Sequence, residues 1–554
     1  MAESKAAKAA AKVLRQSNNE WSNKYFAIAI GAIMFLFAVH YWAGFIQARY
    51  GPKKIYPVLI RTYRRIGHFL STSSIFGTRI ERLLLYIVYW AINLILALTN
   101  VDLTQITYVA KRFGWISVAN LVLLVFLALK NTPLAPLTGN SYEKLRPLHK
   151  VAGYTCIFTS VLHGIVYLSA WGETGKLATM SERKDYAGAI AGTAMVIIAF
   201  STITYFTRRY YELFYMLHII MFALIIITVG MHRPDFSSST VIIVIFTACL
   251  WVMDRIIRGA KIVWNSFGNS ATITALPNEA VRVRLNRRMR ASPGSHAFLW
   301  VPAIRWVESH PFTLLSSTPS EFVIRVYDGF TRDLYKAAQH APGKSLRCSV
   351  DGPYGEAPDF KIFDKVILIA GGSGASFTFA IALDLIETST KKVKSIDFIW
   401  VVRHHESLEW FSQELKRLHS CPDVNLIIHI TGPFDLSGLS SPTVAGSILE
   451  KVSVKDDITQ TVPCPIIATN DLEKGHLSDS GINLYSSTNY IRPGRPDIAS
   501  VINEAATSHG SPDDRVIVGA CGPKELISTT RNAVNNDLRN ERLAVTFYSE
   551  EFEW

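Results

Sequence analysis

Residues 149–163 read HKVAGYTCIFTSVLH and residues 218–232 read HIIMFALIIITVGMH, so each stretch begins and ends with histidine and is mostly apolar between. In a helix, a separation of 14 residues returns the side chain to within roughly 40° of the same face, about 21 Å further along the axis. Ionisable side chains inside membrane spans are costly and indicate a functional site by default. The two stretches therefore predict two spanning helices, each with two histidines on one face.

One apolar segment lies between these helices, so both are expected to cross the membrane in the same direction. His149 can then face His218 near the cytosolic side, and His163 can face His232 near the outer side. Imidazole is a good axial ligand for haem iron. The matched spacing favours two stacked bis-histidine haems over histidines that are merely satisfied within a bundle. The chain has no CxxCH motif, which excludes a covalently attached c-type haem.

The composition predicts a membrane half joined to a soluble half. Of 554 residues, 49% are hydrophobic and only 18% charged, which argues against an ordinary soluble enzyme. The net charge of +13 is scattered and much of it flanks apolar segments, so no nucleic-acid partner is expected. The six cysteines lack CxxC spacing, so neither a zinc site nor a disulfide framework is expected. They are Cys156, Cys249, Cys348, Cys421, Cys464 and Cys521.

Charge-poor runs predict six membrane spans and a shorter seventh. They lie at residues 25–46, 83–99, 113–129, 151–170, 187–206, 213–231 and, for the shorter run, 240–253. Basic residues gather in the loop 47–80, whereas opposite loops hold fewer, such as Lys111 and Arg112. The positive-inside rule then places this loop and the soluble half in the cytosol. The Ala- and Lys-rich residues 2–12 predict a frayed amphipathic tail.

Residues 265–358 read as short strands of a small β-barrel or sandwich. They contain His310-Pro311-Phe312-Thr313, closely followed by Ser316 and Ser317, whose hydroxyl groups could hydrogen-bond a flavin ring. Gly329 and Thr331 could offer donors to a pyrophosphate, or could form a plain β-turn.

The remaining chain reads as a parallel α/β sheet. The apolar strand Val366–Ala370 leads into Gly371-Gly372-Ser373-Gly374-Ala375-Ser376 and a helix, a turn that lets the backbone approach a phosphate. A second strand ends in Arg403, which could meet a 2′-phosphate or simply face solvent. A third leads to Cys521-Gly522-Pro523 at the ligand-binding edge of the sheet, and the terminal Trp554 could stack on a flat cofactor.

Taken together, these motifs resemble the fungal ferric-chelate reductases of the ferric reductase and NADPH oxidase superfamily, over nearly all of residues 81–554. The resemblance implies a multi-span helical membrane bundle of flavocytochrome b type and a cytosolic, ferredoxin-reductase-like half. That half would combine an antiparallel β-barrel FAD domain with a parallel-sheet NADPH domain. The implied boundaries are a tail (1–24), a first span and basic loop (25–80), a transmembrane haem domain (81–257), an FAD domain (262–360) and an NADPH domain (361–554) with an insertion near 433–493.

The resemblance also assigns roles to individual residues. His149, His163, His218 and His232 would ligate two b-type haems. FAD would be bound by His310, Pro311, Phe312 and Thr313, with Ser316, Ser317, Gly329 and Thr331. NADPH would be held by Gly371, Gly372, Ser373, Gly374, Ala375 and Ser376, with Arg403 and Arg495 at its adenosine phosphate end and Gly522 and Pro523 near Cys521. Cys521 would lie by the nicotinamide, and Trp554 would cover the flavin until the nicotinamide displaces it.

The implied function is a transmembrane ferric-chelate reductase that passes electrons from cytosolic NADPH through FAD and two haems to Fe(III), or to Cu(II), across the membrane. A superoxide-generating NADPH oxidase, with O₂ as acceptor, is the alternative. The equal histidine spacing favours the metalloreductase, because the second pair of animal oxidases is typically one residue closer. The plasma membrane and coupling to an iron uptake system are expected. An internal membrane such as the endoplasmic reticulum stays open, because only about 24 residues precede the first span.

Overall fold

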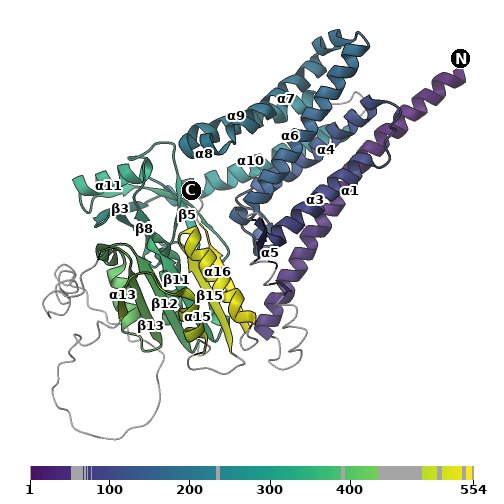
Figure 1. Ribbon diagram of the computed structural model, residues 1–554. Helices are drawn as coiled ribbons and strands as arrows, with labels where there is room; N and C mark the ends of the chain where they lie inside the picture. Colours follow the sequence, from purple (N-terminus) through teal and green to yellow (C-terminus); the bar gives the residue numbers. More distant parts are fainter. Residues whose placement is uncertain are drawn as a thin grey trace, which may run out of the picture. The chain divides into compact units, whose positions relative to one another are not determined.

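The computed structural model describes residues 2–50, 66–67, 70, 73–75, 78–232, 238–388, 393–433, 490–507, 514–539 and 544–551. These residues form a helical unit that extends to Ala260 and a unit of strands and helices that begins at Lys261 (Figure 1). Trp554 lies outside the described residues, as do most of the basic loop 47–80 and nearly all of the predicted insertion 433–493.

In the part of the chain that the structure describes, seven long helices begin in the first unit, at the positions of the predicted apolar runs. They are α1 (Ala2–Tyr50), α3 (Ile80–Leu98), α4 (Ile106–Ala128), α6 (Tyr142–Glu173), α7 (Arg183–Ser201), α9 (Tyr211–Met231) and α10 (Ser238–Ser266). Short helices α5 (Leu134–Thr138) and α8 (Thr204–Arg209) lie between them. Among the described residues, six helices are long and apolar enough to cross a membrane. The exception is α7, whose first turn holds Arg183, Lys184 and Asp185.

Two sequence expectations about the start of the bundle are wrong. The residues expected to form a frayed tail continue without a break into the first span, because α1 begins at Ala2. Lys111 and Arg112 lie within α4 and not in a loop. The buried guanidinium of Arg112 joins α4 to its neighbours. Its Nε donates to Oδ1 of Asn19 in α1 at 2.7 Å, and its Nη atoms donate to three carbonyls at the end of α3, those of Leu96, Thr99 and Asn100.

Within the bundle, α4 packs along α6 and α7 packs along α9. The contact surfaces are built from small and medium-sized apolar side chains, including Leu121, Cys156, Ala191 and Ile225. Small residues at such contacts let helix backbones approach closely, which is how helices associate in a membrane. The two histidine-bearing helices, α6 and α9, are therefore each supported by a neighbouring helix.

The second unit begins with two antiparallel sheets. A five-stranded sheet has the order β7-β8-β4-β3-β9, and a three-stranded sheet has the order β10-β5-β6. Their strands are β3 (Ser270–Leu276), β4 (Ala280–Leu285), β5 (His296–Trp300), β6 (His310–Thr313), β7 (Ser316–Ser317), β8 (Ser320–Arg325), β9 (Ser345–Arg347) and β10 (Ser349–Tyr354). Helix α11 (Phe330–His340) packs on this core through Phe330 and Leu334. The predicted antiparallel β domain is confirmed.

A six-stranded parallel sheet follows, with the order β14-β13-β12-β11-β15-β16, and confirms the predicted α/β arrangement. Its strands are β11 (Lys365–Gly371), β12 (Ser395–Val402), β13 (Val424–Ile430), β14 (Ile491–Pro493), β15 (Arg515–Cys521) and β16 (Ala544–Glu550). The helices are α12 (Ala375–Glu387), α13 (Ser412–His419), α15 (Ile498–Thr507) and α16 (Lys524–Arg539). Both faces of a parallel sheet need such cover.

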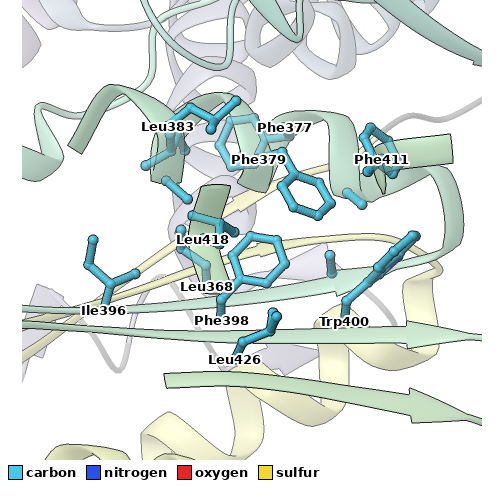
Figure 2. Packing of buried hydrophobic residues seen from close by; sticks show 14 of the residues in the cluster. Leu368, Phe377, Phe379, Leu383, Ile396, Phe398, Trp400, Phe411, Leu418 and Leu426 are labelled. Carbon is cyan, nitrogen blue, oxygen red and sulfur yellow. The ribbon is translucent and has the colours of Figure 1, made fainter. Parts of the chain in front are cut away.

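An aromatic cluster fixes α12 on the sheet. Figure 2 shows Phe379 of α12 between Phe398 of β12 and Phe411, and the ring centroids of both pairs lie 4.6 Å apart. Trp400, also in β12, packs against Phe411 at 5.4 Å and donates from Nε1 to the carbonyl of Gly372 at 3.0 Å. The aromatic core therefore also holds the glycine turn that follows β11.

A buried ion-pair network joins the antiparallel and parallel parts of the second unit. Arg282 in β4 contacts the carboxylates of Glu321 in β8 at 2.7 Å and of Glu414 in α13 at 2.9 Å. Burial would lower the pKa of Arg282, but its hydrogen bonds to Glu414 and the charges of both carboxylates raise the pKa above its usual value. Arg284, two residues further along β4, contacts the same Glu321 at 2.5 Å but is 57% exposed.

Replacing Arg282 by alanine is expected to destabilise the second unit by about 3–5 kcal/mol, because two buried carboxylates lose their counter-charge. Arg284→Ala is the matched control and should cost less than about 1 kcal/mol, since water screens that pair. Thermal or urea unfolding of the full chain, followed by tryptophan fluorescence, measures both. Equal losses for the two variants would contradict a buried ion pair as the link.

Candidate functional site

The four histidines come together in the two expected pairs. The ring centroids of His149 and His218 lie 6.3 Å apart, and those of His163 and His232 lie 6.0 Å apart. In both pairs one ring comes from α6 and the other from α9, where His232 directly follows the last helical residue. The rings are steeply inclined to each other, by 58° and 73°, so neither pair is stacked.

Three of these imidazoles are oriented by hydrogen bonds to main-chain carbonyls. Nδ1 of His149 lies 3.0 Å from the oxygen of Leu124, Nδ1 of His163 lies 2.7 Å from that of Ala110, and Nδ1 of His232 lies 2.8 Å from that of Lys184. A carbonyl only accepts, so Nδ1 carries the proton and Nε2 keeps its lone pair for a metal. Nδ1 of His218 is buried and has no hydrogen-bond partner among the described residues.

Two glycines make room for the outer pair. A Cβ on Gly114 of α4 would lie 2.9 Å from Nδ1 of His163, and one on Gly188 of α7 would lie 2.6 Å from Nδ1 of His232. Any side chain at either position would displace the ring. Sequence reasoning missed both residues, although an isolated glycine within an apolar helical segment is a signal of close approach.

The outer pair lines a cavity of about 1410 Å³. Two imidazoles on opposite sides of one metal ion, each with a bond of about 2 Å, have ring centres roughly 6 Å apart. Both observed separations match this value, and the Nδ1 hydrogen bonds leave Nε2 available. The residues present therefore fit a bis-histidine haem at each pair.

The residues expected to bind a flavin lie together on the antiparallel sheets. The ring of His310 in β6 stacks on Phe330 at 4.8 Å, and its Nε2 lies 3.3 Å from a carboxylate oxygen of Glu308. Pro311 and Phe312 are half-buried, Thr313 is buried, and the partly exposed Ser316 and Ser317 form β7.

Gly329 precedes α11 with a φ of 78°, which favours glycine. No described side chain caps the helix at this residue, and the first backbone N–H groups of a helix suit an anion. The hydroxyl of Thr331 is engaged locally: it accepts from the N–H of Tyr327 at 2.8 Å and donates to its carbonyl at 2.9 Å. Thr331 therefore shapes this turn in the structure, and its backbone N–H is the group at the helix start.

The glycine turn and the Cys521 turn meet at the carboxyl edge of the parallel sheet. Ala370 of β11 pairs with Cys521 of β15. A Cβ on Gly374 would lie 2.6 Å from the carbonyl oxygen of Cys521, and one on Gly522 would lie 2.9 Å from the N–H nitrogen of Gly371. This mutual approach of two backbones explains why glycine is needed on both sides.

The remaining predicted residues lie along the same edge, except for one. Arg403 follows β12 and Arg495 follows β14, and both are exposed. Ser376 is buried and Ser373 partly exposed within the turn and first residues of α12. Cys521 is fully buried, and burial, reinforced by the charge of Glu550, raises its pKa well above the usual value. Trp554, the expected flavin cover, lies outside the described residues.

These features define an integral membrane protein with a flavin- and nicotinamide-nucleotide-binding unit, and comparison with known families gives the same result. Residues 113–229 match the "Ferric reductase like transmembrane component", residues 266–358 an "FAD-binding domain", and residues 363–535 the "Ferric reductase NAD binding domain". The chain is therefore similar to ferric reductases in its transmembrane component and in its NAD-binding domain.

Curated fungal proteins are similar over long stretches. A probable cell surface ferric reductase of Aspergillus oryzae is 28% identical over 55% of this chain, and ferric/cupric reductase transmembrane component 2 of Saccharomyces cerevisiae is 26% identical over 80%. Ferric/cupric reductase transmembrane component 1 of Candida albicans is 25% identical over 95% of this chain and 68% of its own length. The match spans only 45% of the Aspergillus protein and 61% of the Saccharomyces protein.

Gly374→Ala is expected to weaken NADP⁺ binding at least about tenfold, because the new methyl group must push the Cys521 turn away from the sheet edge. Calorimetric titration of the full chain with NADP⁺ measures the loss, and FAD content should not change. Gly259→Ala in α10 is the control, since it adds a methyl group in open space at a glycine that, like Gly374, does not have a positive φ. Unchanged NADP⁺ affinity of Gly374→Ala would mean that this turn does not hold the nucleotide.

Proposed function

We propose that this chain is an NADPH-dependent transmembrane ferric-chelate reductase, with Cu(II) as a second acceptor. The proposal rests on two facing histidine pairs in a bundle that matches the ferric reductase transmembrane component. One NADPH would reduce two Fe(III) to two Fe(II) and release NADP⁺ and one proton. The acceptor would be reduced on the membrane side opposite to the cytosolic NADPH.

In this proposal, residues 81–257 hold two b-type haems, one between His149 and His218 and one between His163 and His232. Residues 262–360 hold FAD, and residues 361–554 bind NADPH, with Arg403 and Arg495 at its adenosine phosphate. Bound FAD and haem supply the change from hydride transfer to single-electron transfer. The carbonyls of Leu124, Ala110 and Lys184 orient three imidazoles and leave their Nε2 atoms for the iron.

Cys521 would act at the nicotinamide end as an uncharged thiol. Its raised pKa keeps the thiol protonated at neutral pH, so neither nucleophilic attack nor general-base catalysis is expected from it. Its position next to Ala370 and against Gly374 instead suits a packing role that sets how closely the nicotinamide approaches.

We propose the plasma membrane as the location, supported by the similarity to a probable cell surface ferric reductase. An internal membrane such as the endoplasmic reticulum is the alternative, and fluorescence microscopy of a tagged chain distinguishes them. On the plasma membrane, the Fe(II) product would be available to an iron uptake system.

The acceptor is tested by turnover of the purified, haem-loaded protein with NADPH. Reduction of an Fe(III) chelate should persist both without oxygen and in the presence of superoxide dismutase, because iron takes the electron directly. Reduction that disappears under either condition would identify superoxide as the product and make the protein an NADPH oxidase.

His163→Ala is expected to lower the haem content from two per chain to one and to abolish Fe(III)-chelate reduction. NADPH oxidation with a soluble dye that accepts electrons from the flavin should stay within about twofold, because the second unit is untouched. Pyridine haemochrome spectra and the two assays measure these effects. His40→Ala, in α1, is the control and should keep both haems; a two-haem spectrum for His163→Ala would refute the ligand assignment.

A further inference from the structure

The cavity beside the outer histidine pair extends well beyond the two rings. Its lining runs from His163 and His232 to the chain segments that connect the helices, including Asp102 after α3 and Glu182 before α7. Its volume of about 1410 Å³ exceeds the roughly 1,000 Å³ at the upper end for small-ligand pockets. Space therefore remains for an acceptor next to a group held between the histidines.

One side of this cavity is formed by early turns of α1, within residues 1–24, which are predicted from the sequence to be an N-terminal tail. Val13, Gln16 and Glu20 are among its lining residues, and Asn19 is another. We call residues 9–20 the α1 wall. None of these residues belongs to the histidine-bearing helices or to the glycines that support the rings.

The α1 wall is held to α4 and to the segment between α3 and α4. Arg112 donates from Nε to Asn19, and both side chains are buried. The guanidinium of Arg15 lies 4.2 Å from the ring centroid of Tyr108 and 4.0 Å from a carboxylate oxygen of Asp102. Nδ2 of Asn18 donates to the carbonyl of Asn100 at 3.4 Å. Contacts on successive turns fix the segment as a rigid wall.

Arg112 is well suited to anchor the wall. It forms hydrogen bonds only to neutral oxygen atoms, and no salt bridge to Arg112 occurs among the described residues. A charged guanidinium in a low-dielectric bundle binds such acceptors strongly. Without them, it would be a buried charge with neither water nor a protein partner, which is costly. Breaking the bond to Asn19 therefore removes the buried contact of the wall and leaves only the exposed contacts of Arg15 and Asn18, while three of the four hydrogen bonds of Arg112 remain.

We propose that the α1 wall selects electron acceptors by size, so that compact Fe(III) chelates reach the His163–His232 end of the cavity and bulky ones do not. The inference rests on the proposed function, because it assumes reduction at that pair. Selection by charge is not expected, because the lining carries both signs. The basic lining residues are Lys12, Arg15, Lys111, Arg112 and Lys184, and the acidic ones are Glu20, Asp102, Glu182 and Asp185.

The test compares Fe(III)–EDTA with the same chelate coupled to dextran, which differ in size but not in the iron site. The purified chain is reduced with dithionite and mixed with each chelate, and haem re-oxidation is followed optically, without NADPH. The ratio of interest is the haem re-oxidation rate with the dextran-coupled chelate divided by the rate with the free chelate. Asn19→Leu and deletion of residues 2–12 should each raise this ratio at least about tenfold. Asn23→Leu is the matched control: Asn23 is buried one turn further along α1, has no hydrogen-bond partner among the described residues and does not line the cavity.

A second readout needs no haem. Ser160→Cys places a thiol in the cavity lining one turn before His163, and its labelling by a small maleimide and by a polyethylene-glycol maleimide gives another size ratio. Labelling of the chain without the Ser160→Cys substitution is subtracted first. In the Ser160→Cys background, each wall variant should then raise the ratio of large-maleimide to small-maleimide labelling at least about fivefold. Ratios unchanged in both assays would overturn the size-selecting wall. A wild-type chain without haem or Fe(III) reduction would instead refute the proposed function, while the labelling ratio would still test the wall.

Discussion

The outer histidine pair depends on one constraint: each imidazole buried among the helices is held by a fixed partner for its Nδ1 atom. In the structure, each ring of this pair has a main-chain carbonyl as partner and a glycine beside it. Ala110 supplies a carbonyl to His163 and Gly114 leaves room for the ring; Lys184 and Gly188 do the same for His232. Carbonyl and glycine are four residues apart in both cases, about one helical turn. Each histidine helix consequently needs its own supporting helix, and α4 and α7 provide them.

The second unit meets a related constraint with backbone rather than side chains. A dinucleotide pyrophosphate needs main-chain N–H groups at close range, which only glycine-rich turns allow. Here the turn after β11 is crowded by the turn after β15, and Gly374 and Gly522 are the positions where a side chain would collide with main-chain atoms. The aromatic cluster around Phe379 and the bond from Trp400 to Gly372 hold this arrangement from the opposite side.

The sequence revealed those features whose signal is local or periodic. Histidine spacing on apolar helices, strand–glycine–helix order and the predicted spans all depend on residues close together in the chain. The supports of the site have no such signal, because a carbonyl such as that of Ala110 can be supplied by any residue type. Gly114 and Gly188 were visible in principle, but a glycine in a spanning helix shows only that something approaches closely, not what approaches.

The misassigned Arg112 shows why the start of α1 could not be predicted. A charge near the end of an apolar run usually indicates a loop, and the bundle overrides that tendency only because the end of α3 offers three carbonyls and Asn19 offers a fourth oxygen. Asn19 is 93 residues away in the chain, so no local pattern connects the two. Because a buried charge must keep its partners, the first turns of α1 belong to the unit that carries the histidines, not to an appendage of it.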